Sequence, residues 1–175
     1  MKIAINRENM MSTLSKLSVS LFLTLFVALT SFSAHARNTA EWNLGQDNLA
    51  IQGYDPVAYF PEGGGQAALG DETLEIEHEG VLYRFANQDN LDLFLSNPDK
   101  YEPTYGGWCA TAMAMGQKIV IVPERFIVKD DRLFLFSFLN GNDAKVMWEQ
   151  NPTGLERRAD FNWKKVSGED PRGKQ

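Results

Sequence analysis

The only cysteine in this chain of 175 residues is Cys109, in the segment YGGWCATAMAMG. A helix that begins after the Gly-Gly pair would place this thiol in its first turn, where unpaired N–H groups and the helix dipole favour the thiolate. Met113 lies four residues further on and shares the helical face of Cys109, whereas Met115 is expected to face elsewhere. A thiolate and a thioether together select Cu(I), so Cys109 and Met113 are candidate ligands for a soft metal ion.

A structural role for Cys109 is the competing interpretation. A buried cysteine behaves as a small hydrophobic residue, and the neighbouring alanines are typical of a close-packed helix. An exposed thiol would also be a hazard in an oxidising compartment. Burial and function are compatible if a pocket opens beside the thiol. Four aromatic residues are candidate walls for it, with the hydrophobic core as their alternative place: Tyr54, Tyr59, Tyr105 and Trp108.

His78 is the third candidate ligand, because it is the only histidine beyond the first 36 residues. It ends the apolar face of a predicted strand, where an imidazole can be half buried with its polar edge in water. Its two interpretations are a structural side chain and an additional donor beside Cys109. One cysteine and one histidine exclude a site built from several such ligands, and they exclude an internal disulfide.

The first 36 residues have the pattern of a secretory signal peptide. Lys2, Arg7 and Lys16 precede an uncharged apolar segment, residues 17–32, and Ala-His-Ala follows at 34–36. An uncleaved membrane anchor is the alternative, but a spanning helix needs roughly 20 apolar residues, more than this segment offers. We therefore expect cleavage after Ala36 and a periplasmic or secreted protein.

The expected mature chain is acidic and suits one domain. The leader carries three of the 17 basic and one of the 23 acidic residues, which leaves 14 against 22 and a formal charge of −8. Nucleic acid and anionic membranes are therefore poor partners, and no membrane contact is expected after cleavage. We predict one domain over residues 37–166, followed by a polar tail, residues 167–175, that frays.

Local patterns predict an α+β fold in which strands and helices alternate. In the first half, Asp55 should cap a short helix, TLEIEHEGVLYRF should form a hairpin that turns at Glu79 and Gly80, and a helix should begin at Asn87. The second half repeats this order. ERFIVKDDRLFLFSF is a second predicted hairpin, and NDAKVMWEQ a helix capped by Asn142, with another short helix after it. Antiparallel hairpins packed with short helices make a single compact α+β domain.

Three segments, DPVAYF, YRFANQDNLDLFLSNPDKY and YGGWCA, give the chain its resemblance to a known family. In these segments it resembles the YHS-domain family, in particular the small exported bacterial members. The similarity covers residues 53–110 and extends more loosely to Trp163. The resemblance implies a YHS-like α+β scaffold and an association with heavy-metal binding.

The family's usual metal ligands are replaced in this chain. Metal-binding members resemble Asp-Pro-Val-Cys at the first motif, where this chain has Ala58, and Phe-Cys-x-x-x-Cys at the second, where it has Ala86 and Asn90. The resemblance thus implies that Ala58, Ala86 and Asn90 meet in the fold. We expect neighbouring apolar groups to fill the emptied site. Stability should then be independent of metal.

These observations lead to three hypotheses of different classes. The first is an exported, non-enzymatic YHS-like binding module that holds a metal ion or small ligand, or docks on a periplasmic protein, through the region around Cys109. The second is a thiol-dependent redox or enzymatic protein, which would need a base or second thiol where the chain offers only His78. The third is an interaction subunit that uses Cys109 for an intermolecular disulfide.

Overall fold

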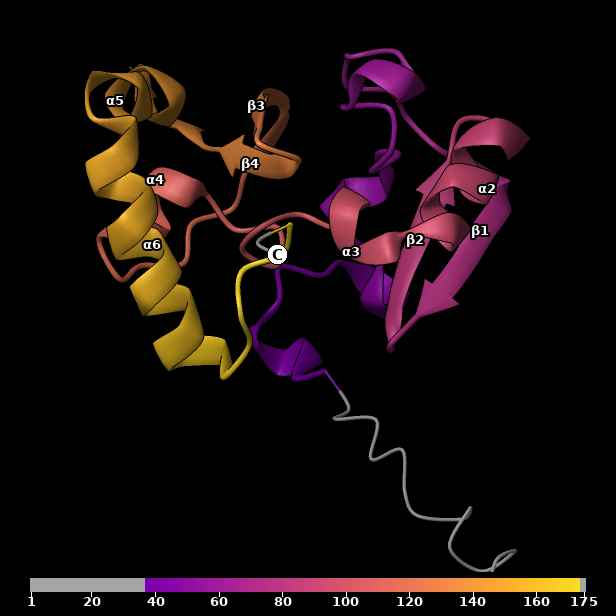
Figure 1. The fold of residues 1–175 in the computed structure, drawn as a ribbon, viewed down its shortest axis with the longest axis horizontal. Coiled ribbons are helices and arrows are strands. Elements are labelled where there is room, and N and C mark those ends of the chain that lie inside the picture. The colour runs from indigo at the N-terminus through magenta and orange to yellow at the C-terminus, as the bar shows by residue number, and fades with distance from the viewer. Residues whose placement is uncertain (1–36, 174–175) are drawn as a thin grey trace, which may run out of the picture. The chain divides into compact units, whose positions relative to one another are not determined.

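Two antiparallel hairpins, each followed by helices, form the framework of residues 37–173, the part of the chain that the computed structural model describes (Figure 1). These residues belong to one unit, so the expected α+β class is confirmed. The predicted signal peptide, residues 1–36, lies outside the described part. Among the described residues, no helix combines the length and hydropathy needed to cross a membrane.

The first half contains the predicted hairpin and helix. β1 (Asp71–His78) pairs with β2 (Val81–Phe85), and Glu79 and Gly80 both adopt positive φ at the turn, as a tight hairpin requires. Asn87 caps α2 (Gln88–Ser96) by accepting a hydrogen bond from the N–H of Asn90. The other elements are α3 (Pro98–Tyr101) and four 3-10 helices: η1 (Thr39–Glu41), η2 (Gln46–Asn48), η3 (Ile51–Gly53) and η4 (Pro61–Gly63).

The second half repeats the order with two differences from expectation. Asp143, rather than Asn142, caps α5 (Ala144–Gln150) by accepting from the N–H of Lys145. Both residues belong to the second strand of a short extra hairpin that precedes the helix. The last helix, α6, is not short: it runs over 16 residues and begins with Asn151 as its cap. The elements are α4 (Ala110–Ala114), β3 (Val122–Lys129), β4 (Arg132–Phe136), β5 (Phe138–Leu139), β6 (Asn142–Asp143), α5 (Ala144–Gln150) and α6 (Pro152–Ser167).

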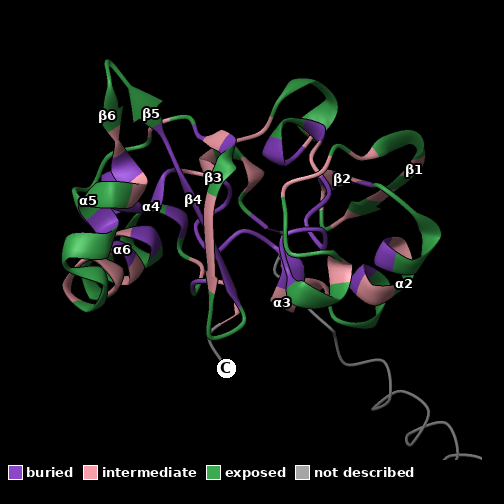
Figure 2. Cartoon of the chain, turned by 90° about the horizontal axis from the view of Figure 1, so that it is seen from above, coloured by how far each residue is buried: buried purple, intermediate pink, exposed green. Residues whose placement is uncertain are grey.

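Aromatic side chains fill the interior on both sides of the fold. Phe94 of α2 packs on Tyr83 and Phe85 of β2, with ring centroids 4.8 and 5.2 Å apart. At the other side, Trp148 of α5 packs on Phe134 of β4 at 5.2 Å. Strand β4 is buried along its whole length, as the purple segment of Figure 2 shows. The core therefore runs through β4 toward the segment that carries the cysteine.

The polar tail is folded against the domain up to Gly173, so the expectation that it frays is wrong. Glu169 accepts a hydrogen bond from the N–H of Asn38, 3.2 Å away, and Arg172 forms an ion pair with buried Glu102 at 2.9 Å. The two ends of the described chain consequently run side by side (Figure 1). The prediction failed because these partners are more than 60 residues away in sequence.

Candidate functional site

Cys109 is held at the junction of α4 and β4. It is the N-terminal cap residue of α4, its N–H donates to the carbonyl of Ile119 at 3.1 Å, and its carbonyl accepts from the N–H of Met113 at 2.9 Å. It also forms a β-bridge with Leu135 of β4. Its side chain is fully buried. The thiol is therefore fixed by backbone contacts on two sides, and α4, with five residues, is too short to add a strong dipole.

The Cys109 sulfur has a specific polar neighbour. The hydroxyl of Ser137, directly after β4, donates to Sγ across 3.3 Å, and Ser137 is itself only 5 % exposed. Sulfur accepts hydrogen bonds weakly, so this contact orients the two side chains toward each other without holding them strongly. This pair could not be predicted from local sequence patterns, because Ser137 and Cys109 are 28 residues apart.

A cavity of about 200 Å³ lies beside this thiol, between α4, α5 and the β5–β6 hairpin. No charged side chain lines it. Met115, Leu139 and Met147 are partly exposed apolar residues at its edge. Its lining residues are Cys109, Thr111, Ala112, Met115, Gln117, Ile119, Ser137, Leu139, Asn140, Asn142, Ala144 and Met147.

The methionines that line the cavity are not the one that sequence spacing favoured. Met113 is 1 % exposed, packs in the core and does not line the cavity, whereas Met115, expected to face elsewhere, does line it. Helical spacing fails because α4 ends at Ala114, and Met115 leaves the helical path with ψ near 4°. Met147 joins the lining from α5, a contact that sequence spacing could not reveal.

His78 and the four aromatic candidates lie elsewhere. His78 is on β1 with its ring against Phe94, 5.9 Å between centroids, and β1 and α4 lie at opposite ends of the described unit in two perpendicular views (Figures 1 and 2). None of the four aromatic residues lines the Cys109 cavity. Three of them make hydrogen bonds: Tyr54 to Glu124, Tyr105 to Asp160 at 2.9 Å, and Trp108 to the carbonyl of Glu41 at 2.6 Å. Tyr59 is buried against Phe126.

Ala58, Ala86 and Asn90 all contact the carboxylate of Asp55, the two alanines through their backbone N–H groups and Asn90 through its side chain. This buried group accepts from the N–H of Ala58 at 3.3 Å, from the N–H of Ala86 at 2.9 Å and from the side-chain amide of Asn90 at 2.6 Å. It also accepts from the N–H of Val57 at 2.8 Å. The predicted short helix after Asp55 is in consequence a hydrogen-bonded turn.

Hydrogen-bonded polar groups therefore occupy this junction, where we expected apolar side chains. The Asn90 amide is 3 % exposed and is directed at a fully buried carboxylate, so the expectation of apolar filling is wrong. A carboxylate that already accepts four hydrogen bonds has little capacity left to bind a metal ion. Across residues 37–173, no three His, Cys, Asp or Glu side chains are arranged to hold one.

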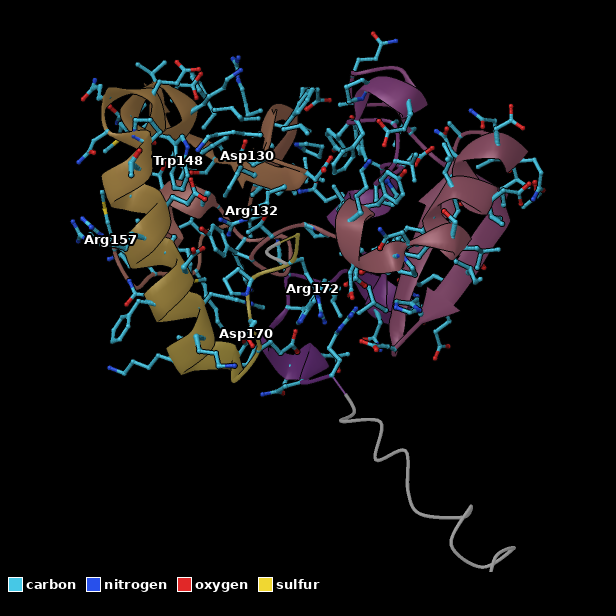
Figure 3. All side chains as sticks on the ribbon, viewed as in Figure 1. Asp130, Arg132, Trp148, Arg157, Asp170 and Arg172 are labelled. Carbon is cyan, nitrogen blue, oxygen red and sulfur yellow. The ribbon has the colours of Figure 1, made fainter. Side chains whose placement is uncertain are left out.

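A larger cavity, about 380 Å³, lies where the C-terminal segment passes α3 and the β3–β4 turn. Asp130, Asp170 and Arg172, which are labelled in Figure 3, are among its lining residues. Its charges largely pair with one another: Lys100 lies 3.5 Å from Asp131, and Arg172 lies 3.4 Å from Asp99. These side chains already have charged partners, and the pair of Arg172 with Asp99 holds the C-terminal segment against α3, which makes the uncharged Cys109 cavity the better candidate site.

Comparisons with family models, with curated proteins and with solved structures found no match to this chain.

Proposed function

We propose that this protein is an exported, non-enzymatic binding module of the YHS type that holds a small uncharged ligand in the cavity beside Cys109. The observation that carries the proposal is the lining of this cavity, which combines apolar side chains, neutral amides and one hydrogen-bonded thiol without any charged group. Ligand sites typically have this composition of apolar walls and a few polar groups that fix orientation. Export and the family assignment come from the leader and the three sequence segments.

The size of the cavity limits the ligand. Drug-sized ligands and organic cofactors occupy roughly 300–1,000 Å³, whereas an apolar cavity of about 150 Å³ accommodates benzene. The volume of about 200 Å³ beside Cys109 thus suits a single ring, a short aliphatic chain or one apolar side chain of a partner protein. It excludes a nucleotide or a haem as the complete occupant in this conformation.

The absence of charged side chains from the cavity lining further restricts the class of ligand. An ionised ligand would lose hydration on entry and find no counter-charge, which is costly in a partly apolar environment. The cavity also contains no His, Asp, Glu, Lys or Arg side chain. A thiol-dependent enzyme needs a base near its nucleophile, so the lining favours binding over catalysis.

A soft monovalent metal is the second candidate ligand, because three sulfur-bearing side chains line the same cavity. Cys109 as thiolate would neutralise the charge of Cu(I), and Met115 and Met147 would supply thioether donors. A divalent ion would keep an uncompensated positive charge there. A third hypothesis, an interaction subunit linked through Cys109, is less well supported, because the thiol is fully buried.

Amide NMR on the mature protein tests the neutral-ligand proposal, with benzene and indole as probes. We expect shift changes at Ala112, Ser137 and Ala144, weakened at least about tenfold by Leu139→Trp, which blocks the edge of the cavity. Leu95→Trp is the matched control, because Leu95 is equally exposed, 51 % against 50 %, and does not line the cavity. Absent shifts, or equal binding by both variants, would reject the proposal.

Titration with Cu(I) against a competing chelator tests the metal alternative. Cys109→Ala should abolish binding and Met147→Leu should weaken it, whereas Met113→Leu, in the core, should leave it unchanged. Equal affinity of wild type and Cys109→Ala would exclude the thiol as a ligand.

A further inference from the structure

The thiol of Cys109 is covered, although a cavity lies beside it. Cys109 belongs to the lining of this cavity, yet its side chain is 0 % exposed, so surface water does not reach the sulfur. A ligand or reagent can therefore contact the thiol only after part of the cavity wall has moved. The wall consists of α4, the segment 115–119 that follows it, α5 and the β5–β6 hairpin.

Three of these four wall segments are firmly attached to the domain. All five residues of α4 are buried. In the segment that follows, the N–H of Gln117 donates to a carbonyl of α4 at 2.9 Å, and the carbonyl of Ile119 accepts from the N–H of Cys109 at 3.1 Å. Helix α5 is anchored by Trp148, whose buried ring packs on two phenylalanines of β4. Movement of any of these segments would disrupt the core or its backbone hydrogen bonds.

The fourth segment, the β5–β6 hairpin, is fixed at its base but not at its tip. At the base, the N–H of Ala144 donates to the carbonyl of Ser137 at 3.1 Å, and the carbonyl of Ala144 accepts from the hydroxyl of Thr111 at 2.7 Å. Within the described chain, no backbone hydrogen bond joins the tip, residues 138–143, to another segment. The tip is largely exposed, as its green colour in Figure 2 shows. Segments with so few buried contacts open most readily.

Arg125 of β3 connects the hairpin tip to the rest of the domain. Its Nε lies 3.6 Å from the carboxylate of Asp143, and its guanidinium lies 5.5 Å from the ring centroid of Phe138. Among the described side chains, no other forms an ion pair or a cation–π contact with the tip. The Arg125 side chain is 46 % exposed, so water screens the pair and the pair contributes little stability. The tip is thus held closed by a weak contact.

We propose that the hairpin tip, residues 138–143, is a flap over the Cys109 cavity, which Arg125 holds closed and which swings outward about its base to admit a ligand to the thiol. The tip supplies Leu139, Asn140 and Asn142 to the lining, so its closure completes the cavity and its opening removes one wall. Flaps of this kind govern how fast ligands enter and leave a site. The ligand part of this inference rests on the proposed function, for which it assigns the route of entry.

Labelling of Cys109 with the disulfide reagent DTNB measures the opening in the mature protein, because the chain contains no other cysteine. The thiolate attacks the reagent, forms a mixed disulfide and releases one thionitrobenzoate, whose absorbance is recorded. At urea concentrations below the unfolding transition, we expect a rate that is nearly independent of urea, because opening of the flap exposes little surface. A rate with the urea dependence of global unfolding, or a rate equal to that of a free thiol, would overturn the proposal.

Two variants remove the contact that holds the flap from opposite sides. Arg125→Gln and Asp143→Asn should each accelerate labelling about two- to fivefold, and the double variant should label no faster than either alone. Asparagine at position 143 can still cap α5. Arg158→Gln, at an exposed position on α6, is the matched control for the loss of one positive charge. Labelling of both variants at the rate of this control would contradict the role of Arg125.

Benzene exchange, measured by NMR, tests the flap as the route of ligand entry. Arg125→Gln should raise the association and dissociation rates by the same factor, about two- to fivefold, and leave Kd unchanged, because the flap acts on entry and exit alike. A changed Kd with unchanged rates would contradict this route. The labelling experiment decides whether the flap opens even if benzene does not bind, a result that would reject only the proposed function.

Discussion

The side-chain amide of Asn90 donates a hydrogen bond of 2.6 Å to the carboxylate of Asp55, and both groups are buried. The same carboxylate oxygen accepts from the N–H of Ala86, at the end of β2. A single acidic residue in the DPVAYF segment thereby joins the first turn, the hairpin and helix α2.

Replacement of Asn90 by alanine should destabilise the folded protein. The change removes one donor from a buried carboxylate, for which we expect a loss of about 1–3 kcal/mol in the free energy of unfolding. Gln66→Ala, at an exposed position, should change it by less than about 0.5 kcal/mol. Urea denaturation of both variants provides the comparison. A loss for Asn90→Ala as small as that of the control would show that the amide is dispensable.

Chelators should leave the melting temperature of the mature protein unchanged. The reason is that Asp55 is satisfied by four protein donors, and no described group of three His, Cys, Asp or Glu side chains is placed to bind a structural metal. A domain of this size that folded around zinc would lose much of its stability. Calorimetry with and without EDTA is the measurement. A fall of several degrees that one added metal reverses would reveal a structural site.

The parts of the fold that the sequence predicted correctly are those determined by neighbouring residues. The two hairpin turns, Glu79–Gly80 and Asp130–Asp131, and the cap at Asn87 follow from local backbone preferences. The cap of α5 was misplaced by one residue because hairpin β5–β6 precedes it, and its strands are only two residues long.

The candidate site was predicted less completely, because its parts come from distant segments. Cys109 was singled out by its chemistry, but the sequence did not establish whether a cavity lies beside it, and Ser137, Met147 and the neutral amides approach it only through the packing of β4 and α5. The pairing of Arg172 with Glu102 escaped prediction for the same reason. Residue type therefore indicates which group is a candidate for chemistry, whereas long-range packing determines what surrounds that group.

Alkaline pH should unfold this protein steeply. Burial raises the pKa of Tyr59, Tyr83 and Tyr105, and nearby carboxylates add to the shift. Because these folded-state values exceed the unfolded value of about 10, stability is fully present below pH 10 and is lost as the pH rises above it. Each tyrosine should lower the free energy of unfolding by about 1.4 kcal/mol per pH unit. Circular dichroism with tyrosinate absorbance should show unfolding and ionisation together.

Two phenylalanine variants refine this prediction. The Tyr59 hydroxyl has no hydrogen-bond partner among the described residues, so Tyr59→Phe should preserve or raise stability by about 1 kcal/mol at neutral pH and flatten the alkaline decline. Tyr105→Phe should flatten the alkaline decline in stability to the same extent. At neutral pH, however, it should lower the free energy of unfolding by about 1 kcal/mol, because the Tyr105 hydroxyl donates a hydrogen bond to Asp160. Ionisation of the tyrosines well before unfolding would contradict their burial as the cause.

The turn that leads into Cys109 should depend on Gly106. This residue has a φ of +57°, and a Cβ there would lie 2.5 Å from the ring of Trp163 and 3.1 Å from that of Trp42. Gly106→Ala should therefore combine backbone strain with a clash in the core, lowering the free energy of unfolding by about 2–4 kcal/mol. Gly141 also has a positive φ, +78°, but a Cβ there would meet nothing within 4 Å.

Gly141→Ala is thus the matched control, since it carries the backbone strain alone, for which we expect a loss of about 1 kcal/mol. The difference between the two variants in urea denaturation measures the clash. Because the Gly106 carbonyl also accepts from the N–H of Asn43 at 2.8 Å, displacement of this turn should loosen the N-terminal segment as well. Faster hydrogen exchange at Asn43 in Gly106→Ala, but not in Gly141→Ala, would confirm that connection. Equal losses of stability in both variants would show that the tryptophans move aside and that the close approach at Gly106 is not required.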